Sequence, residues 1–276
     1  MIDIKKQSEL RAKYNPEGSV LRQIQLGALD ALVEFDSVCK KNNIKYWLDS
    51  GTLLGAIRHG GFIPWDDDID ICVRRQDYNR LLKCLKRDLG SQFKLHNGRK
   101  DIDRNAVTPC VISRVLNKKV MVSRKKDKNG NPLYEPIWID IFPLENGNAA
   151  IKRFVEKTYG KFLRRKVYMI NDGWFKHAIS VVLEPICLPF VYILRLFARL
   201  FHSKTFILDF GINFDSIRYR YKQDVFPLSE CSFEGILFPC PCNADSYLKY
   251  IYGDYNQIPS DENRRTHKFF DIKELE

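Results

Sequence analysis

The sequence lacks the features that identify several large classes of protein. It contains no internal repeat and no low-complexity tract, and its 45% of hydrophobic residues rule out a mainly disordered chain. No helix-turn-helix, RNP or zinc-finger pattern accompanies its basic residues, so we expect no nucleic-acid partner.

The sequence also lacks a signal-peptide core and an uninterrupted membrane span. The first nine residues are polar, so we expect the chain to remain in the cytoplasm. The apolar segment 179–201 contains Glu184, two prolines and two arginines, and falls short of the ~20 apolar residues that a spanning helix needs. Two alternatives remain for this segment: a helix that lies in the membrane interface, and a helix that is buried in the fold.

An excess of positive charge is the most evident feature of the composition. The 276 residues carry a formal net charge of +11, and the basic residues are concentrated in segments 114–128 and 152–166. A positive field favours an anionic partner, either a phosphate-bearing ligand or an acidic membrane. A solvated basic surface without function is the alternative.

The eight cysteines are spread along the chain, and several lie in apolar runs. A chain of this size does not need a disulfide framework, so we expect reduced cysteines in the core of a cytosolic protein. Cys231 with Cys240 and Cys242 lacks the usual zinc spacing and an obvious fourth ligand, so zinc is not expected there.

Hydrophobic periodicity and turn residues predict an α+β fold. Helices are expected at about 19–41, 53–58, 76–89 and 245–252, and strands at 44–48, 62–73, 111–116, 119–122, 137–142 and within 233–241. Ser19 can cap the first of these helices, and its apolar residues Leu21, Ile24, Leu29, Leu32 and Val33 form one stripe. Residues 149–221 have a helical, basic and apolar pattern. We interpret the chain as a core (1–148), a helical insertion (149–221) and a C-terminal part (222–276) that completes the core.

An acidic strand gives the strongest indication of function. Within the segment 65–71, alternation along a strand places Asp68 and Asp70 on one face, while Ile69 and Ile71 enter the core. Two adjacent carboxylates repel one another unless a cation compensates their charge, and hard oxygen ligands suit Mg²⁺ or Mn²⁺. We therefore predict a metal site at Asp68 and Asp70. The preceding residues 66–67 fit a solvated acidic loop equally well.

Four further residues are candidates for the same site. Gly51 and Thr52 stand where a strand passes into a short helix, so backbone amides can face an anion there, although an ordinary helix cap is the alternative. Arg58, late in that helix, is either a phosphate contact or a surface arginine. Asp140 is the only polar residue in the apolar strand 138–142, where a carboxylate requires a metal or a buried salt bridge.

Together these residues resemble the signature of polymerase-β type nucleotidyltransferases, and segment 46–70 resembles the LicD/fukutin family over its whole length. Segment 138–143 agrees with that family, as does segment 252–255 followed by Pro259, Arg264 and His267. Ser260 stands where the family pattern has a second proline, which concerns only the shape of a loop. Segment 149–221 contains no recognised motif, and substrate choice is expected to reside there.

The resemblance implies a nucleotidyltransferase-like core, with a mixed β-sheet flanked by helices, and a helical insertion. It implies Mg²⁺- or Mn²⁺-dependent transfer of a phospho-alcohol from a CDP-alcohol, such as CDP-choline or CDP-ribitol, to a sugar hydroxyl of a cell-surface glycan, with release of CMP. The expected partners are the CDP-alcohol donor and a glycan or lipid-linked glycan acceptor. With segment 1–148 as the catalytic core, the basic and apolar insertion 149–221 is expected to contact the acceptor or, peripherally, the anionic inner membrane surface, and segment 222–276 to complete the active site. The donor alcohol does not follow from the motif.

The resemblance also assigns roles to individual residues. Asp68, Asp70 and Asp140 are the expected metal ligands and catalytic groups, and Asp140 could also orient or deprotonate the acceptor hydroxyl. The expected contacts to the substrate come from Gly51, Thr52, Arg58, Asp67, Arg264 and His267.

Two other functions fit part of the pattern. Asp68 and Asp70 also fit the Asp-x-Asp metal motif of sugar-nucleotide glycosyltransferases, which leaves Gly51, Thr52 and Asp140 unexplained. A catalytically inactive binding protein would have no need of the three carboxylates. Magnesium-dependent release of CMP from a CDP-alcohol separates these alternatives.

Overall fold

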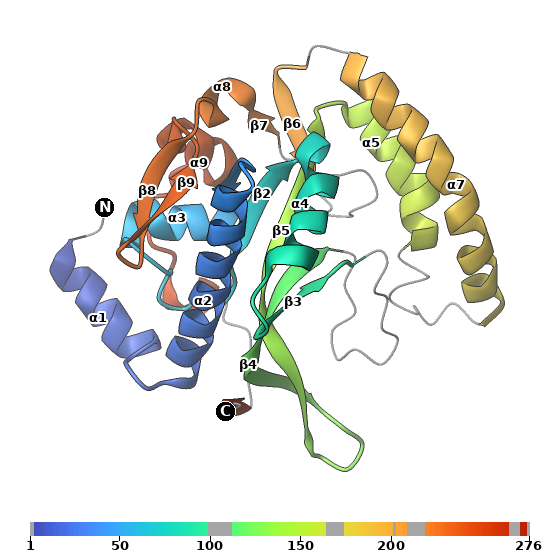
Figure 1. The fold of residues 1–276 in the computed structure, drawn as a ribbon. Coiled ribbons are helices and arrows are strands. Elements are labelled where there is room, and N and C mark those ends of the chain that lie inside the picture. The colour runs from blue at the N-terminus through green and yellow to red at the C-terminus, as the bar shows by residue number, and fades with distance from the viewer. Residues whose placement is uncertain are drawn as a thin grey trace.

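A mixed β-sheet runs through the centre of the molecule (Figure 1). The structure, a computed structural model, describes residues 3–98, 112–163, 174–200, 203–208, 219–264 and 271–274. Five strands follow one another in the order β1 (Tyr46–Leu48), β2 (Asp70–Arg74), β5 (Pro132–Asn146), β4 (Ser113–Lys126) and β10 (Asp271–Glu274). In addition β3 (Phe93–His96) pairs with β4, and β6 (Thr205–Leu208) joins β5 to β7 (Arg220–Tyr221).

The direction of pairing makes the sheet mixed. Strands β2 and β5 are parallel, and the other strand pairs among the described residues are antiparallel. Helices flank the sheet, so the expected α+β fold of the nucleotidyltransferase type is confirmed.

Two helices that contact each other cover one part of the sheet. Helix α2 (Val20–Lys41) packs on β4 and β5, and helix α4 (Arg75–Asp88) packs on β2, β3 and β5. The Ser19 side chain caps α2 by accepting a hydrogen bond from the Arg22 amide at 3.2 Å, as the sequence predicts. Within the apolar stripe of α2, Ile24 and Leu32 are fully buried against the sheet, whereas Val33 is exposed.

A second group of elements packs around helix α3 (Ser50–His59). Helix α9 (Ala244–Tyr252) and the hairpin of β8 (Ser229–Phe233) and β9 (Ile236–Cys240) all come from the C-terminal part of the chain. Both α9 and β8 contact α3, while β9 contacts β1. The remaining helical elements of these parts of the chain are α1 (Ile4–Tyr14), the single turn α8 (Lys222–Val225) and the 3₁₀ turn η2 (Asp261–Asn263).

The structure corrects several expected strand and helix boundaries. The strand expected over 62–73 begins only at Asp70, because Gly60 ends α3 in the left-handed conformation (φ 68°) and a loop follows. The expected helix 53–58 begins earlier, at Ser50. The strands expected at 111–116 and 119–122 form one strand, β4, with a register shift between Asn117 and Met121.

Strand β5 also runs further than expected, through Pro143 to Asn146. Pairing with β4 ends at Ile141, and pairing with β6 starts at Leu144. Pro143 therefore lies between two antiparallel ladders, where its missing N–H removes no bond from either of them.

Segment 149–221 is not helical throughout. It contains α5 (Ala149–Val155), a π-helical turn η1 (Glu156–Gly160) and the long helix α7 (Trp174–Leu200). It also contains β6 and β7, which join the central sheet. Figure 1 shows α5 and α7 side by side at the side of the molecule opposite α1.

Buried polar side chains attach the C-terminal part to the core. Asp49, between β1 and α3, accepts a hydrogen bond from Arg220 Nη2 at 2.5 Å and another from the Tyr247 hydroxyl. All three side chains are buried, and the Trp47 indole N–H also donates to the Tyr247 hydroxyl at 3.3 Å. Burial would raise the pKa of Asp49, but the Arg220 charge and the hydrogen bonds from Arg220 and Tyr247 hold it below its ordinary value.

Replacing Arg220 by methionine tests this attachment. Arg220→Met should lower the free energy of unfolding by about 3–5 kcal/mol, because Asp49 stays buried without its cation. Lys249→Met breaks an exposed pair with Asp245 and should cost less than about 0.5 kcal/mol. Urea denaturation at neutral pH measures both values.

The cost of Arg220→Met should also depend on pH. The folded-state pKa of Asp49 is depressed, so the stability that it contributes is present above the unfolded pKa and is lost as the pH falls through the folded pKa. If Arg220→Met lowered the free energy of unfolding no more than Lys249→Met does, Asp49 and Arg220 would not form a strong buried pair.

Candidate active site

Carboxylates gather where β2 and β5 run side by side. Asp70 is the first residue of β2 and lies opposite Asp140 in the parallel register. The Asp140 amide donates to the Ile69 carbonyl at 2.9 Å, which fixes the start of the pairing. Asp66 and Asp68 lie on the segment that leads into β2. The structure therefore brings together Asp68, Asp70 and Asp140, as the sequence predicts.

The alternation expected of a strand is present although β2 begins only at Asp70. Asp66, Asp68 and Asp70 are each half-buried, whereas Ile69 and Ile71 are fully buried. Asp66 shares the parity of the other two carboxylates, a signal that is visible in the sequence. The acidic face thus has one more member than expected.

Repulsion among these carboxylates is strong. Burial, and then the charges of Asp68 and Asp140, raise the pKa of Asp70 well above its ordinary value. Burial, followed by Asp68 and Asp67, does the same to the pKa of Asp66. A group of acids that resist ionisation beside one another is suited to a cation.

Gly51 and Thr52 border the same cluster. The Thr52 hydroxyl oxygen accepts a hydrogen bond from the Asp70 amide at 2.8 Å, which ties the first turn of α3 to the start of β2. A Cβ atom on Gly51 would lie 2.8 Å from Asp66 Oδ2, so a larger residue would displace that carboxylate. Glycine leaves room for the Asp66 carboxylate at this position, beside the first amides of α3.

Two arginines that the sequence reasoning did not single out bind the neighbouring acids. Arg114 Nε donates to Asp140 Oδ1 at 2.7 Å, and Arg124 Nη2 lies 3.3 Å from Asp67 Oδ2. Both guanidinium groups lie over the Trp138 ring, at 4.1 Å and 4.6 Å from its centroid. Asp140 therefore forms the salt bridge that the sequence left open, but the pair is only partly buried. The Asp67 side chain is buried and pairs with Arg124.

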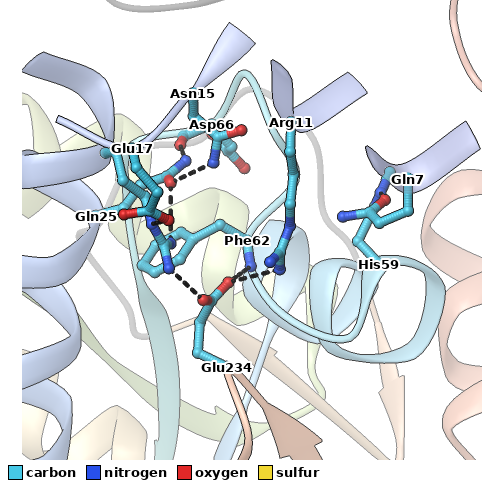
Figure 2. A network of polar contacts seen from close by, with 10 residues as sticks. Gln7, Arg11, Asn15, Glu17, Gln25, His59, Phe62, Asp66 and Glu234 are labelled. Carbon is cyan, nitrogen blue, oxygen red and sulfur yellow. Dashed lines mark hydrogen bonds and ion pairs between the residues drawn. The ribbon is translucent and has the colours of Figure 1, made fainter. Parts of the chain in front are cut away.

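A polar network fixes the loop between α3 and β2. Figure 2 shows Glu234 at the centre of this network, below Phe62. The Glu234 carboxylate accepts from the Phe62 amide at 3.0 Å and pairs with Arg11 and Arg22, at 3.2 Å and 2.8 Å. In the same network, Gln25 Nε2 donates to the Asp66 carbonyl at 2.7 Å. Residues from α1, α2 and the β8–β9 turn thus fix the acidic segment.

The remaining sequence candidates occupy other positions. The Arg58 side chain is buried in the last turn of α3, and its Nη1 donates to the carbonyls of Tyr255 and Gln257 at 2.6 Å and 3.1 Å. It therefore braces the C-terminal loop, about 9 Å along α3 from Thr52. Arg264 lies 4.8 Å from the centroid of Trp65, the residue before Asp66. His267 lies outside the described residues.

The missed residues differ in how visible they are in the sequence. Arg114 is the only charged residue of the expected strand 111–116, which is a usable signal for a cross-strand ion pair with Asp140. Gln25 and Glu234 carry no such signal, because they reach the loop from segments far away in the sequence.

The residues fit a divalent cation in charge and in ligand type. Within the described residues, no group of three or more Asp, Glu, His or Cys side chains is arranged to hold a metal ion by itself. Mg²⁺ in phosphate chemistry is usually held by one or two carboxylates together with substrate phosphates and water, so a protein cage of three ligands is not required. Asp68 and Asp70 provide such a pair.

Known proteins resemble this chain over long segments. The family model for LicD/FKTN/FKRP, nucleotidyltransferase domain, matches residues 43–193, more than half of the chain. Lipopolysaccharide cholinephosphotransferase LicD of Haemophilus influenzae is 26% identical over 259 residues, covering 90% of this chain and 95% of that protein. An uncharacterized protein of Rickettsia typhi is 39% identical over 125 residues, which are 44% of this chain and 38% of that protein. Ribitol 5-phosphate transferase FKRP of Homo sapiens is 39% identical over 54 residues, which are 20% of this chain and 11% of FKRP. The chain therefore belongs to the LicD/FKTN/FKRP family and carries its nucleotidyltransferase domain.

Proposed function

We propose that this LicD-type phosphotransferase moves a phospho-alcohol of the phosphocholine type from a CDP-activated donor to a sugar hydroxyl of a cell-surface glycan. The observation that carries the proposal is the half-buried acidic face of Asp66, Asp68 and Asp70 beside Asp140, since such a face requires a cation and suits a diphosphate bound through it. The similarity to a cholinephosphotransferase and to a ribitol 5-phosphate transferase supports the phospho-alcohol.

Mg²⁺ or Mn²⁺ is the proposed cofactor, and Asp68 and Asp70 would hold it, with Asp140 alongside. When bound, the ion supplies charge stabilisation on the diphosphate of the donor. Thr52 accepts a hydrogen bond from the Asp70 amide, and its hydroxyl proton can still donate to a phosphate oxygen. The amides of the first turn of α3 and the positive end of its dipole add to that contact.

The proposed reaction is an in-line displacement at phosphorus. The oxygen of the sugar hydroxyl attacks the phosphorus that bears the alcohol, the bond from this phosphorus to the CMP oxygen breaks, and CMP leaves. The hydroxyl proton passes to a carboxylate, for which Asp140 is the candidate. Arg114 and the Trp138 indole N–H, at 2.7 Å and 3.3 Å from the two carboxylate oxygens of Asp140, would orient it.

We also propose that the protein acts in the cytoplasm and meets a glycan or a lipid-linked glycan acceptor at the inner membrane surface. The net charge of +11 favours both an anionic donor and an anionic surface.

The direct test is incubation of the purified protein with separate CDP-alcohols and nucleotide sugars, with and without Mg²⁺, and with a glycan acceptor. The proposal expects consumption of a CDP-alcohol, with release of CMP only in the presence of the metal. Consumption of a nucleotide sugar instead would favour a glycosyltransferase. No consumption of any donor by the folded protein would favour a binding protein.

The acidic face can be tested by Asp68→Asn and Asp70→Asn. Each change removes a charge at nearly constant shape, so turnover should fall on the order of 10²–10³-fold. Without metal, both variants should melt at a higher temperature than the wild type, because repulsion is relieved, and they should lose most of the stabilisation that Mg²⁺ gives the wild type. Thermal unfolding with and without Mg²⁺ and assays of CMP release measure these effects. Asp30→Asn, which removes an exposed carboxylate of α2, is the matched control and should change neither.

The role of Asp140 can be tested by separating turnover from donor binding. Asp140→Asn should lower kcat by about 10²–10⁴-fold and leave the KM for the donor nearly unchanged, because a base acts in the transition state. Arg114→Lys keeps the charge but loses the planar contact at Nε, and should reproduce part of the kcat loss. A large rise in KM with normal turnover at saturation would instead make Asp140 a residue for ground-state binding.

A further inference from the structure

Helix α7 has its polar side turned toward the protein. The side chains of Ser180, Glu184 and Arg195 are buried, and Glu184 and Arg195 are only 6% and 3% exposed. Large apolar side chains occupy the outward side at helical spacing: Ile179, Val182, Ile186, Phe190, Ile193, Phe197 and Leu200. This distribution is the reverse of that of a surface helix in water.

Specific contacts fix the orientation of the helix. The Tyr159 hydroxyl in η1 donates to Glu184 Oε1 at 2.8 Å, and Arg195 Nε donates to Glu145 Oε1 of β5 at 2.5 Å. The four side chains are buried, so rotation of α7 to hide its apolar side would break two buried polar contacts. These two contacts therefore keep the apolar side of α7 facing outward.

Exposed basic side chains lie on the elements that contact α7. Helix α5 and turn η1 contact α7, and Arg153 of α5, Lys157 of η1 and Lys161, directly after η1, are exposed, as is Phe154 of α5. The carboxylates in the described parts of α5, η1 and α7 are turned to internal partners, since Glu156 pairs with Lys152 and Glu184 bonds to Tyr159. The outward charges of these three elements are therefore basic.

We propose that the outward side of α7 and the basic edge of α5 and η1 lie in the interface of an anionic lipid bilayer. The apolar residues would enter the boundary between headgroups and acyl chains to a depth of ~5–10 Å, while the arginine and lysine side chains contact acidic headgroups. A second copy of the chain fits this surface less well, because it would bring the same basic charges and no exposed carboxylate from these elements. The inference does not depend on the proposed reaction.

The arrangement fits an interfacial helix better than a spanning one. Residues Ala178–Ala198 are long and apolar enough to cross a membrane by length and composition, with 22% of that window buried. However, one side of the helix is occupied by η1 and β5 through the contacts of Glu184 and Arg195, so lipid cannot surround it. A helix in contact with lipid on one side only belongs at the membrane surface.

Flotation with lipid vesicles tests the proposal on the full chain. The wild type should bind vesicles of phosphatidylcholine with phosphatidylglycerol, bind phosphatidylcholine alone much more weakly, and be released by high salt. Phe190→Ser with Ile193→Ser should weaken binding by about a hundredfold, because two apolar side chains no longer enter the bilayer. Arg153→Glu with Lys157→Glu should weaken it by about thirtyfold or more.

Matched controls alter the same chemistry elsewhere on the surface. Ile4→Ser with Leu237→Ser removes two exposed apolar residues, and Lys5→Glu with Lys118→Glu makes the same change of charge, both outside α5, η1 and α7. Both controls should float like the wild type. Thermal unfolding identifies any variant that fails to fold. If the double serine variant of α7 fails to fold, Phe190→Ala with Ile193→Ala, a milder change on the same side of the helix, replaces it.

Four outcomes would overturn the proposal. The first is equal loss of binding in the α7 variants and in their controls. The second is a wild type that remains unbound to acidic vesicles at low salt, and the third is a set of α7 variants that change only the oligomeric state seen by light scattering. The fourth concerns depth: the fluorescence that a Phe190→Trp variant adds to that of the four native tryptophans should be quenched more strongly by bromine near the headgroups than by bromine deep in the acyl chains, and the reverse order would indicate a spanning helix.

Discussion

The parallel pairing of β2 with β5 is the constraint on which the site depends. It places Asp70 opposite Asp140 and leads the chain into β2 through Asp66 and Asp68, so four carboxylates meet at one place. Burial and mutual repulsion make this arrangement costly, as the raised pKa values of Asp66 and Asp70 indicate. The surrounding structure must therefore hold the acids in place, and a bound cation and diphosphate would relieve the repulsion.

Residues from several elements of the fold hold the acids in place. Arg114 on β4 and Trp138 on β5 hold Asp140, while Thr52 in the first turn of α3 accepts from the Asp70 amide. In addition, the buried pair of Asp49 with Arg220 fixes the start of α3 against the C-terminal part. Arg220, like Gln25 and Glu234, lies outside the matched range 43–193, so segments beyond that range also bear on the site.

The sequence was informative where a local pattern reports a local environment. The Ser19 cap, the stripe of α2 and the burial of Ile69 and Ile71 follow from spacing alone. The start of β2 and the passage of β5 through Pro143 did not follow, because both depend on which strand lies alongside.

The same limit applies to the site. The parity of Asp66 with Asp68 was available in the sequence, and so was the single charge of Arg114 within segment 111–116. The contact of Gln25 with the Asp66 carbonyl was not available, since α2 approaches that loop only in the folded chain. Arg58 carries a charge that suits phosphate, but its burial on the carbonyls of Tyr255 and Gln257 depends on a segment almost two hundred residues away in the sequence.

Strand β5 links the acidic face to helix α7. Asp140 lies at the acidic face, and five residues further along the same strand Glu145 binds Arg195 of α7. At about 3.3 Å per residue, these positions are only ~16 Å apart along a rigid element of the sheet. A bilayer that contacts the outward side of α7 would therefore lie at a fixed distance from the acids. An enzyme that modifies a lipid-linked glycan would gain from this arrangement, because the surface that holds the acceptor and the residues that hold the donor would be positioned by one strand.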